Sequence, residues 1–166
     1  MIELQIIDNF LPEKEFESIN KLFMDEDHDF PWYYNDDIVY DDDGLFQFVH
    51  MFFTTKRGPV SKHLLIWNNF IIKVGSNKNK CRRIKSNLTI KTKEPKPTPY
   101  HTDFEDMITA IFYINTNNGY TEFETGVRVD SIANRVCIFD SNLKHRGVSH
   151  TEGDHRRIVV NFNYER

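Results

Sequence analysis

The segment PYHTDF at residues 99–104 places a histidine and an aspartate two positions apart. In an extended strand, side chains at positions i and i+2 point to the same face. His101 and Asp103 would therefore project together, while Thr102 would point away. An imidazole and a carboxylate on one face can bind the same metal ion, but a pair with this spacing also occurs by chance in many chains.

A third candidate ligand lies downstream in IFDSNLKHRGVSHT, residues 138–151. An apolar strand is expected over residues 136–140, and His145 comes just beyond it. Two histidines and one carboxylate form a facial ligand set that leaves open positions on an octahedral iron ion. Other residues that could supply a ligand are His150 and His155 in place of His145, and Glu105 and Asp106 in place of Asp103.

The segment RRIVVNFNY at residues 156–164 predicts a strand that begins with two arginines. Neighbouring residues in a strand face opposite ways, so only one of the two can face a cavity. If Arg157 faces inward, the apolar residues Ile158, Val160 and Phe162 all face the opposite layer. The other register would bury asparagines there at a desolvation cost, which favours Arg157 and leaves Arg156 as the alternate. A guanidinium stays charged and matches a carboxylate in a bidentate way.

The rest of the chain predicts two helices and a series of short strands. Helices are expected over residues 12–24 and 61–73, with a loop over the acidic segment 25–43. Arg83, Lys85, Asn87 and Thr89 alternate with apolar residues, which predicts a strand from Arg82 onward with a polar face. The other expected strands are residues 2–7, 45–54, 100–103, 107–115, 120–124, 136–140 and 156–164. This order predicts helices packed on a closed or two-layered antiparallel β structure.

Composition excludes several classes of function. A net charge of −4 and a pI near 6.0 give no overall attraction to nucleic acid or to anionic membranes. No apolar stretch is long enough to span a membrane, and the N-terminus does not resemble a signal peptide. Cys81 and Cys137 do not form a disulfide framework or a metal-ligand spacing. We therefore expect a cytoplasmic protein, in the host cytoplasm if the chain is viral.

The order of these segments resembles the 2-oxoglutarate- and Fe(II)-dependent dioxygenases of the prolyl-hydroxylase-like type, including small phage and bacterial members. The motifs that carry the resemblance are His101-x-Asp103, Phe139-Asp-Ser141 before His145, Arg156-Arg157, FYIN at residues 112–115 and NFNY at residues 161–164. It covers residues 83–164 well, whereas residues 1–80 match only in general plan.

This resemblance implies a fold and a division of the chain. The expected fold is mainly β, a double-stranded β-helix (jelly-roll or cupin-like) core with N-terminal α-helices packed on the major sheet. A single oxygenase domain would span residues 1–166. Residues 1–80 would form a helical support region, and residues 81–166 would form the β-helix core with the metal site.

The resemblance also implies a site. His101, Asp103 and His145 would bind Fe(II), with 2-oxoglutarate and O2 as cosubstrates and no catalytic residue beyond the metal centre. Arg157 and Tyr113 would bind the distal carboxylate of 2-oxoglutarate, with Arg156 as the alternate to Arg157.

The implied activity is a hydroxylase that couples 2-oxoglutarate decarboxylation to C–H oxidation of a peptide, prolyl or small-molecule substrate. Members that halogenate lack the carboxylate supplied here by Asp103. Members that repair nucleic acids carry a second arginine six positions after the first, whereas this chain has Asn163 or Phe162 there, so a nucleic-acid substrate is disfavoured.

The alternative is a non-catalytic cupin-like metal-binding or interaction module. Structural zinc sites are usually closed by four protein ligands rich in cysteine, a pattern that this sequence lacks. His50, within the apolar segment 45–54, is expected in the core and not in contact with a substrate.

Overall fold

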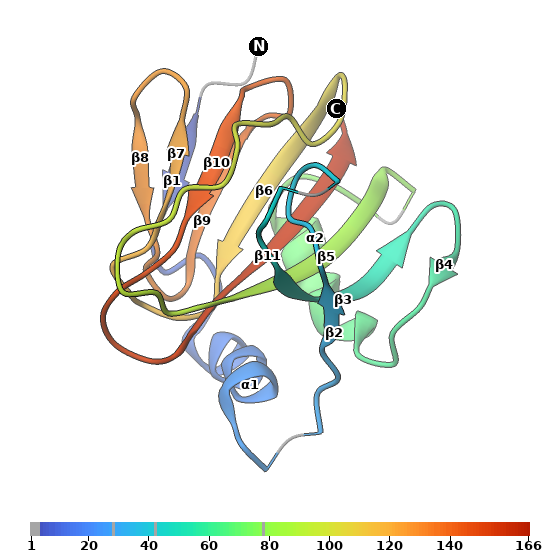
Figure 1. Cartoon of the computed structure of the whole chain (residues 1–166). Coiled ribbons are helices and arrows are strands. Elements are labelled where there is room, and N and C mark those ends of the chain that lie inside the picture. The colour runs from blue at the N-terminus through green and yellow to red at the C-terminus, as the bar shows by residue number, and fades with distance from the viewer. Residues whose placement is uncertain (1–3, 28, 42, 78) are drawn as a thin grey trace.

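The computed structural model describes residues 4–27, 29–41, 43–77 and 79–166 and contains two layers of β-structure and one layer of helices (Figure 1). The helices are α1 (Glu13–Met24), the 3-10 helix η1 (Leu64–Trp67) and α2 (Asn68–Lys73). The strands are β1 (Gln5–Ile7), β2 (Tyr33–Asn35), β3 (Gln47–Thr54), β4 (Gly58–Pro59), β5 (Cys81–Ile90), β6 (Met107–Tyr113), β7 (Tyr120–Phe123), β8 (Arg128–Asp130), β9 (Arg135–Asp140), β10 (His145–Val148) and β11 (Arg156–Glu165).

The strands form a large and a small antiparallel sheet. The large sheet has the order β1-β9-β6-β11-β5-β3-β2, with β4 paired to β3, and the small sheet has the order β10-β7-β8. Strands distant in sequence are neighbours, so β11 at the C-terminus lies between β5 and β6. The expected fold class, a mainly β jelly-roll core with helices on the major sheet, is confirmed.

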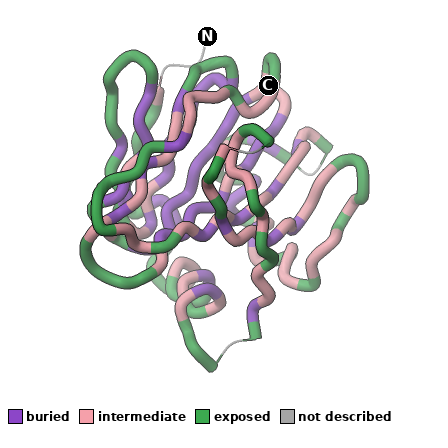
Figure 2. Tube along the Cα trace, in the orientation of Figure 1, coloured by how far each residue is buried: buried purple, intermediate pink, exposed green. Residues whose placement is uncertain are grey.

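The helices cover one face of the large sheet. In α1, Ile19 and Phe23 lie one turn apart and are both buried, as the apolar spacing of the sequence predicts. Trp67 and Phe70 contribute from the second helical segment, and Phe70 stacks on Phe162 of β11 with ring centroids 4.0 Å apart. Figure 2 shows buried residues along the central strands and exposed residues in the connecting loops. Among the described residues, no helix is long and apolar enough to cross a membrane.

The opposite face of the large sheet faces the small sheet. Part of this space is a second apolar cluster of Ile111, Tyr113, Phe123, Val129, Cys137, Phe139 and Val159. The remainder is a polar cavity. The period-two alternation of β5 and β11 separates the two faces, since Ile158, Val160 and Phe162 pack in the helix-side core. The register expected for β11, with Arg157 on the inner face, is confirmed by its position in the cavity wall.

Several elements differ from expectation. Residues 100–103 do not form a strand. Among them, His101 alone makes a β-bridge, which is an isolated one to His145. The acidic segment contains the short strand β2, and the second helix is a 3-10 turn followed by a short α-helix. Strands β4, β8 and β10 were not expected. The expected strand 2–7 is β1, and residues 2 and 3 lie outside the described residues.

Candidate metal centre

The two histidines of the predicted ligand set are joined directly through their backbones. The amide of His101 donates to the carbonyl of His145 at 3.0 Å, and the amide of His145 donates to the carbonyl of His101 at 3.0 Å. This bridge fastens the segment after the proline-rich loop to strand β10, and the imidazole rings lie 4.6 Å apart between centroids. Both rings are therefore brought to one place without a regular strand around His101.

Backbone carbonyls set the orientation of both rings. Nδ1 of His145 lies 3.0 Å from the carbonyl oxygen of Leu143, and Nδ1 of His101 lies 3.3 Å from that of Pro99. A carbonyl only accepts hydrogen bonds, so each Nδ1 carries a proton, and in the neutral ring this tautomer leaves the lone pair on Nε2. This arrangement is typical of metal-binding histidines, whose second nitrogen donates to a fixed acceptor.

Asp103 is held by three donors on the large sheet. Arg83 of β5 donates to Oδ1 at 2.9 Å, whereas Thr109 of β6 and Asn163 of β11 donate to Oδ2 at 3.2 and 3.1 Å. Because Asn163 also donates to the Thr109 hydroxyl, three strands fix this one carboxylate. Protein donors therefore set its orientation.

Electrostatics keeps Asp103 and His145 in the protonation states that bind a cation. Burial alone would raise the pKa of Asp103, but the charge of Arg83 and the hydrogen bond from Asn163 lower it to about 2. Burial lowers the pKa of His145, although the nearby Asp103 carboxylate opposes this shift. The carboxylate is therefore ionised and His145 neutral at physiological pH, as metal coordination requires.

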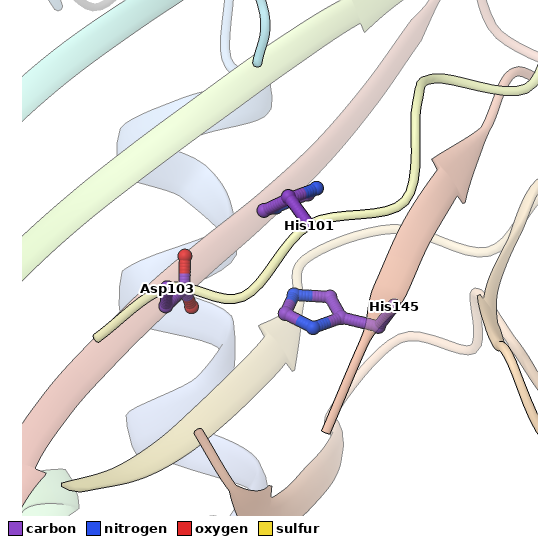
Figure 3. Close-up of side chains that lie close together, drawn as sticks. All are labelled: His101, Asp103 and His145. Carbon is purple, nitrogen blue, oxygen red and sulfur yellow. The ribbon is translucent and has the colours of Figure 1, made fainter. Parts of the chain in front are cut away.

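The ligand atoms of His101, Asp103 and His145 all lie within 4.8 Å of one another. Figure 3 shows the ring of His145 on β10 pointing toward the two residues of the 99–104 segment. The alternative ligands are located elsewhere. His150 is buried with Nε2 2.8 Å from the carbonyl oxygen of Asp154, and His155, Glu105 and Asp106 are exposed.

The three residues line one end of a cavity of about 370 Å³ between the two sheets. Strands β5 and β11 form its floor, and residues 38–40 also line it. Tyr40 fastens this loop beside the metal centre, because its hydroxyl donates to the carbonyl of Tyr100 at 3.1 Å. Three buried oxygens in the cavity wall have no hydrogen-bond partner among the described residues: Oδ1 of Asn87, Oγ1 of Thr89 and Oδ1 of Asn161. The cavity is therefore polar and lined by groups that can bind a ligand.

Arg157 lies on the cavity floor, away from the metal cluster along β11. Its side chain is buried, its Nε donates to the hydroxyl of Ser131 at 2.8 Å, and its guanidinium lies 6.0 Å from the ring centroid of Tyr113. Over the described residues, no carboxylate forms an ion pair with it. Burial lowers its pKa, which reflects the cost of an unpaired buried cation. A ligand carboxylate would remove this cost.

Arg156 faces the other way, as the strand register predicts. Its guanidinium pairs with Asp154 at 3.0 Å and reaches the carbonyl of Met24 at the end of α1. Tyr113 shares the inner face of the large sheet, but its hydroxyl donates to Thr121 at 2.8 Å and the residue does not line the cavity. His50 is a core residue, as expected, with ring nitrogens 2.8 Å from Ser61 Oγ and from the Pro31 carbonyl.

Sequence reasoning missed the residues that hold the site together. Thr109 and Asn163 fix Asp103, and Ser131 fixes Arg157. Only Asn163 carried a signal, because strand alternation placed it on the same face as Arg157. Thr109 and Ser131 are ordinary polar residues in the sequence, and only the pairing of strands brings them to the site.

Solved structures share this architecture. An oxidoreductase of the 2OG-Fe(II) oxygenase family from Burkholderia pseudomallei matches with a TM-score of 0.69 and 12% identity, over 98% of this chain and 84% of that one. A prolyl hydroxylase from Trichoplax adhaerens, solved with a hypoxia-inducible-factor peptide, matches with a TM-score of 0.64 and 16% identity, over 98% and 83%. A viral collagen prolyl hydroxylase from Paramecium bursaria Chlorella virus-1 has a TM-score of 0.59 and 13% identity, over 98% and 96%.

No protein-family model and no curated protein matches the sequence. The structural similarity extends over nearly the whole chain, although few residues are identical. The chain therefore has the fold of the 2-oxoglutarate- and Fe(II)-dependent oxygenases.

Proposed function

We propose that this protein is an Fe(II)- and 2-oxoglutarate-dependent oxygenase that hydroxylates its substrate. The observation that carries the proposal is the joint occurrence, in one cavity, of a two-histidine, one-carboxylate cluster and a buried arginine without a carboxylate partner among the described residues. The fold shared with known oxygenases supports it.

The residues present fit both groups. His101, Asp103 and His145 would hold Fe(II), because two imidazoles with free Nε2 atoms and one ionised carboxylate make the ligand set of this iron chemistry. Arg157 would hold the distal carboxylate of 2-oxoglutarate, because its planar donors match a carboxylate and its burial excludes competing water.

When bound, iron and 2-oxoglutarate supply the oxidising chemistry: O2 is consumed, 2-oxoglutarate is converted to succinate and CO2, and a substrate C–H bond is oxidised. The protein positions these partners. His101, Asp103 and His145 would hold the ion by three ligands, and Arg157 would orient 2-oxoglutarate through its distal carboxylate. Residues 38–40 form part of the cavity wall.

For the substrate, we propose only a chemical class. The Trichoplax enzyme was solved with a peptide, and its likeness to this chain supports a peptide or protein target, with a small molecule as the alternative. The cavity beside the metal cluster is large enough to admit a side chain or a compound of similar size next to the cosubstrate.

The proposal is tested by succinate formation. Purified protein is incubated with Fe(II), 2-oxoglutarate and O2, and succinate is quantified by mass spectrometry with and without panels of peptides and amino acids. We expect succinate that requires both Fe(II) and 2-oxoglutarate and that increases with a substrate. Calorimetry in the absence of O2 measures 2-oxoglutarate binding separately. A protein that binds no 2-oxoglutarate with Fe(II) present and forms no succinate would contradict the proposal.

A further inference from the structure

The cavity contains a cation that the proposed chemistry does not use. Lys85 of β5 lies in the cavity wall and is largely covered, yet over the described residues it forms no ion pair and no hydrogen bond. Burial and the neighbouring charge of Arg83 lower its pKa to about 8, although Asp103 opposes the shift. The amine is therefore mostly protonated at neutral pH, in a place where a lone charge is costly.

Lys85 lies at the metal end of the cavity floor. It pairs across the strands with Asn161 of β11, whereas Arg157 pairs with Thr89 further along the same two strands. The two residues are therefore four positions apart along the strands, which corresponds to roughly 13 Å of extended backbone. Their surroundings differ as well: Arg83 and Asp103 are the charges that act on Lys85, whereas Arg157 lies against Ser131 and Tyr113.

The charges in the cavity do not balance without another anion. Asp103 is paired with Arg83 at 2.9 Å. If the proposed function holds, the two carboxylates of 2-oxoglutarate meet the iron and Arg157. Lys85 then remains uncompensated in a cavity that already carries net positive charge. Such a cavity attracts an anion and disfavours a cationic or purely apolar group.

The groups around Lys85 suit an oxyanion. Asn87 follows it on the same face of β5, and Asn161 lies opposite on β11. Both residues line the cavity, and among the described residues their Nδ2 groups donate to no partner. An amide group has two N–H donors and one acceptor. A carboxylate at Lys85 would receive an ammonium hydrogen bond and amide donors together, which gives direction as well as attraction.

Resting on the proposed function, we propose that the substrate carries a carboxylate that binds Lys85, with Asn87 and Asn161 at its sides, and that this contact places the target C–H bond at the metal. The carboxylate belongs to a free amino-acid-sized acid or to an acidic side chain of a peptide. A neutral prolyl group, by contrast, would leave the Lys85 ammonium buried and unpaired.

Binding measurements with matched acid and amide probes test this proposal. The protein loaded with Fe(II) and saturating 2-oxoglutarate is titrated without O2 by calorimetry. The probes are L-aspartate against L-asparagine, L-glutamate against L-glutamine, and end-blocked pentapeptides with a central Asp against Asn. We expect at least one acid to bind about tenfold or more tightly than its amide, a difference of roughly 1.4 kcal/mol. The free acids and the blocked peptides distinguish the two sources of the carboxylate.

Three variants assign the preference to Lys85. Lys85→Met removes the charge and should abolish the preference for acids, whereas Lys85→Arg should retain part of it. Lys56→Met, at an exposed position in the turn after β3, is the control and should bind acids as the wild type does. Circular dichroism checks that each variant is folded.

The outcomes separate this inference from the proposed function. Equal binding of every acid and its amide, or an unchanged preference in Lys85→Met, would overturn the inference. A Lys85→Met variant that loses 2-oxoglutarate binding more than acid binding would also overturn it, because Lys85 would then serve the cosubstrate. Failure of the wild type to bind 2-oxoglutarate at the outset would instead contradict the proposed function.

Discussion

The side chain of Arg157 passes directly beside the backbone of Gly119. A Cβ built on Gly119 would lie 2.7 Å from Cδ of Arg157 and 2.9 Å from the carbonyl oxygen of Val148. The arginine side chain could shift, but the carbonyl belongs to strand β10 and is fixed by the small sheet. Glycine at this position therefore lets the buried guanidinium lie along the cavity floor.

We predict that Gly119→Ala displaces Arg157 and weakens binding of 2-oxoglutarate by about tenfold or more, since one misplaced buried contact costs above 1 kcal/mol. Calorimetry on the Fe(II)-loaded protein without O2 measures this change. Gly147→Ala is the matched control, because its added methyl would lie 3.9 Å from Arg157, an ordinary contact. Equal effects of the two substitutions would show that the close approach at Gly119 is unimportant.

Arg157→Ala should raise the 2-oxoglutarate concentration needed for half-maximal turnover on the order of a hundredfold, because the cosubstrate loses its buried charged partner. Arg156→Ala should change it little, since Arg156 pairs with Asp154 on the opposite face. Initial rates of succinate formation over a range of 2-oxoglutarate concentrations measure both. The reverse ranking would refute the assignment of Arg157 to the cosubstrate.

His101→Ala and His145→Ala should each reduce Fe(II)-dependent succinate formation to background while the protein stays folded. The fold is expected to survive because the bridge between the two residues uses their backbones, which alanine retains. Metal content and thermal unfolding are measured alongside turnover. His155→Ala, at an exposed position, is the control, and activity retained in either ligand variant would exclude that residue from the metal site.

Lys85 should make the stability of the metal-free protein depend on pH. Its pKa falls from 10.5 in the unfolded chain to about 8 in the folded protein. Between these two values the unfolded chain binds more protons, so the free energy of unfolding rises with pH over this window. The shift corresponds to roughly 3 kcal/mol at most, and this cost applies in full below pH 8.

Lys85→Met should therefore be more stable than the wild type at pH 7, and the difference should decrease as pH rises through the window. Urea unfolding at pH 7 and at pH 10 measures both free energies. The difference in free energy of unfolding between the two proteins is compared at the two pH values. An equal difference at both would contradict the burial of a charged amine.

Much of the fold could be predicted because its central strands have clear periodicity. In β5 and β11, polar and apolar residues alternate, so the cavity face and the helix face follow from the sequence. Strands β8 and β10 could not be predicted in this way. They are short, β10 includes Gly147 between polar and apolar residues, and both are stabilised by pairing with β7.

The structure brings the three predicted metal ligands together, but their local structure differs from the prediction. His101 and Asp103 were expected on a strand, yet the prolines before them and the positive φ of Asp106 after them shape an irregular segment. The histidine reaches its place through one bridge to His145. Tyr113 lies on the expected face, but the sequence could not reveal that Thr121 would accept its hydroxyl hydrogen bond.

The mutual hydrogen bonds between the backbones of His101 and His145, and the three donors on Asp103, all come from the protein itself. The fold thus holds the three ligands in place, and little conformational entropy would be lost when an ion binds. Release and rebinding of a metal ion at this site would therefore need no cycle of unfolding and refolding.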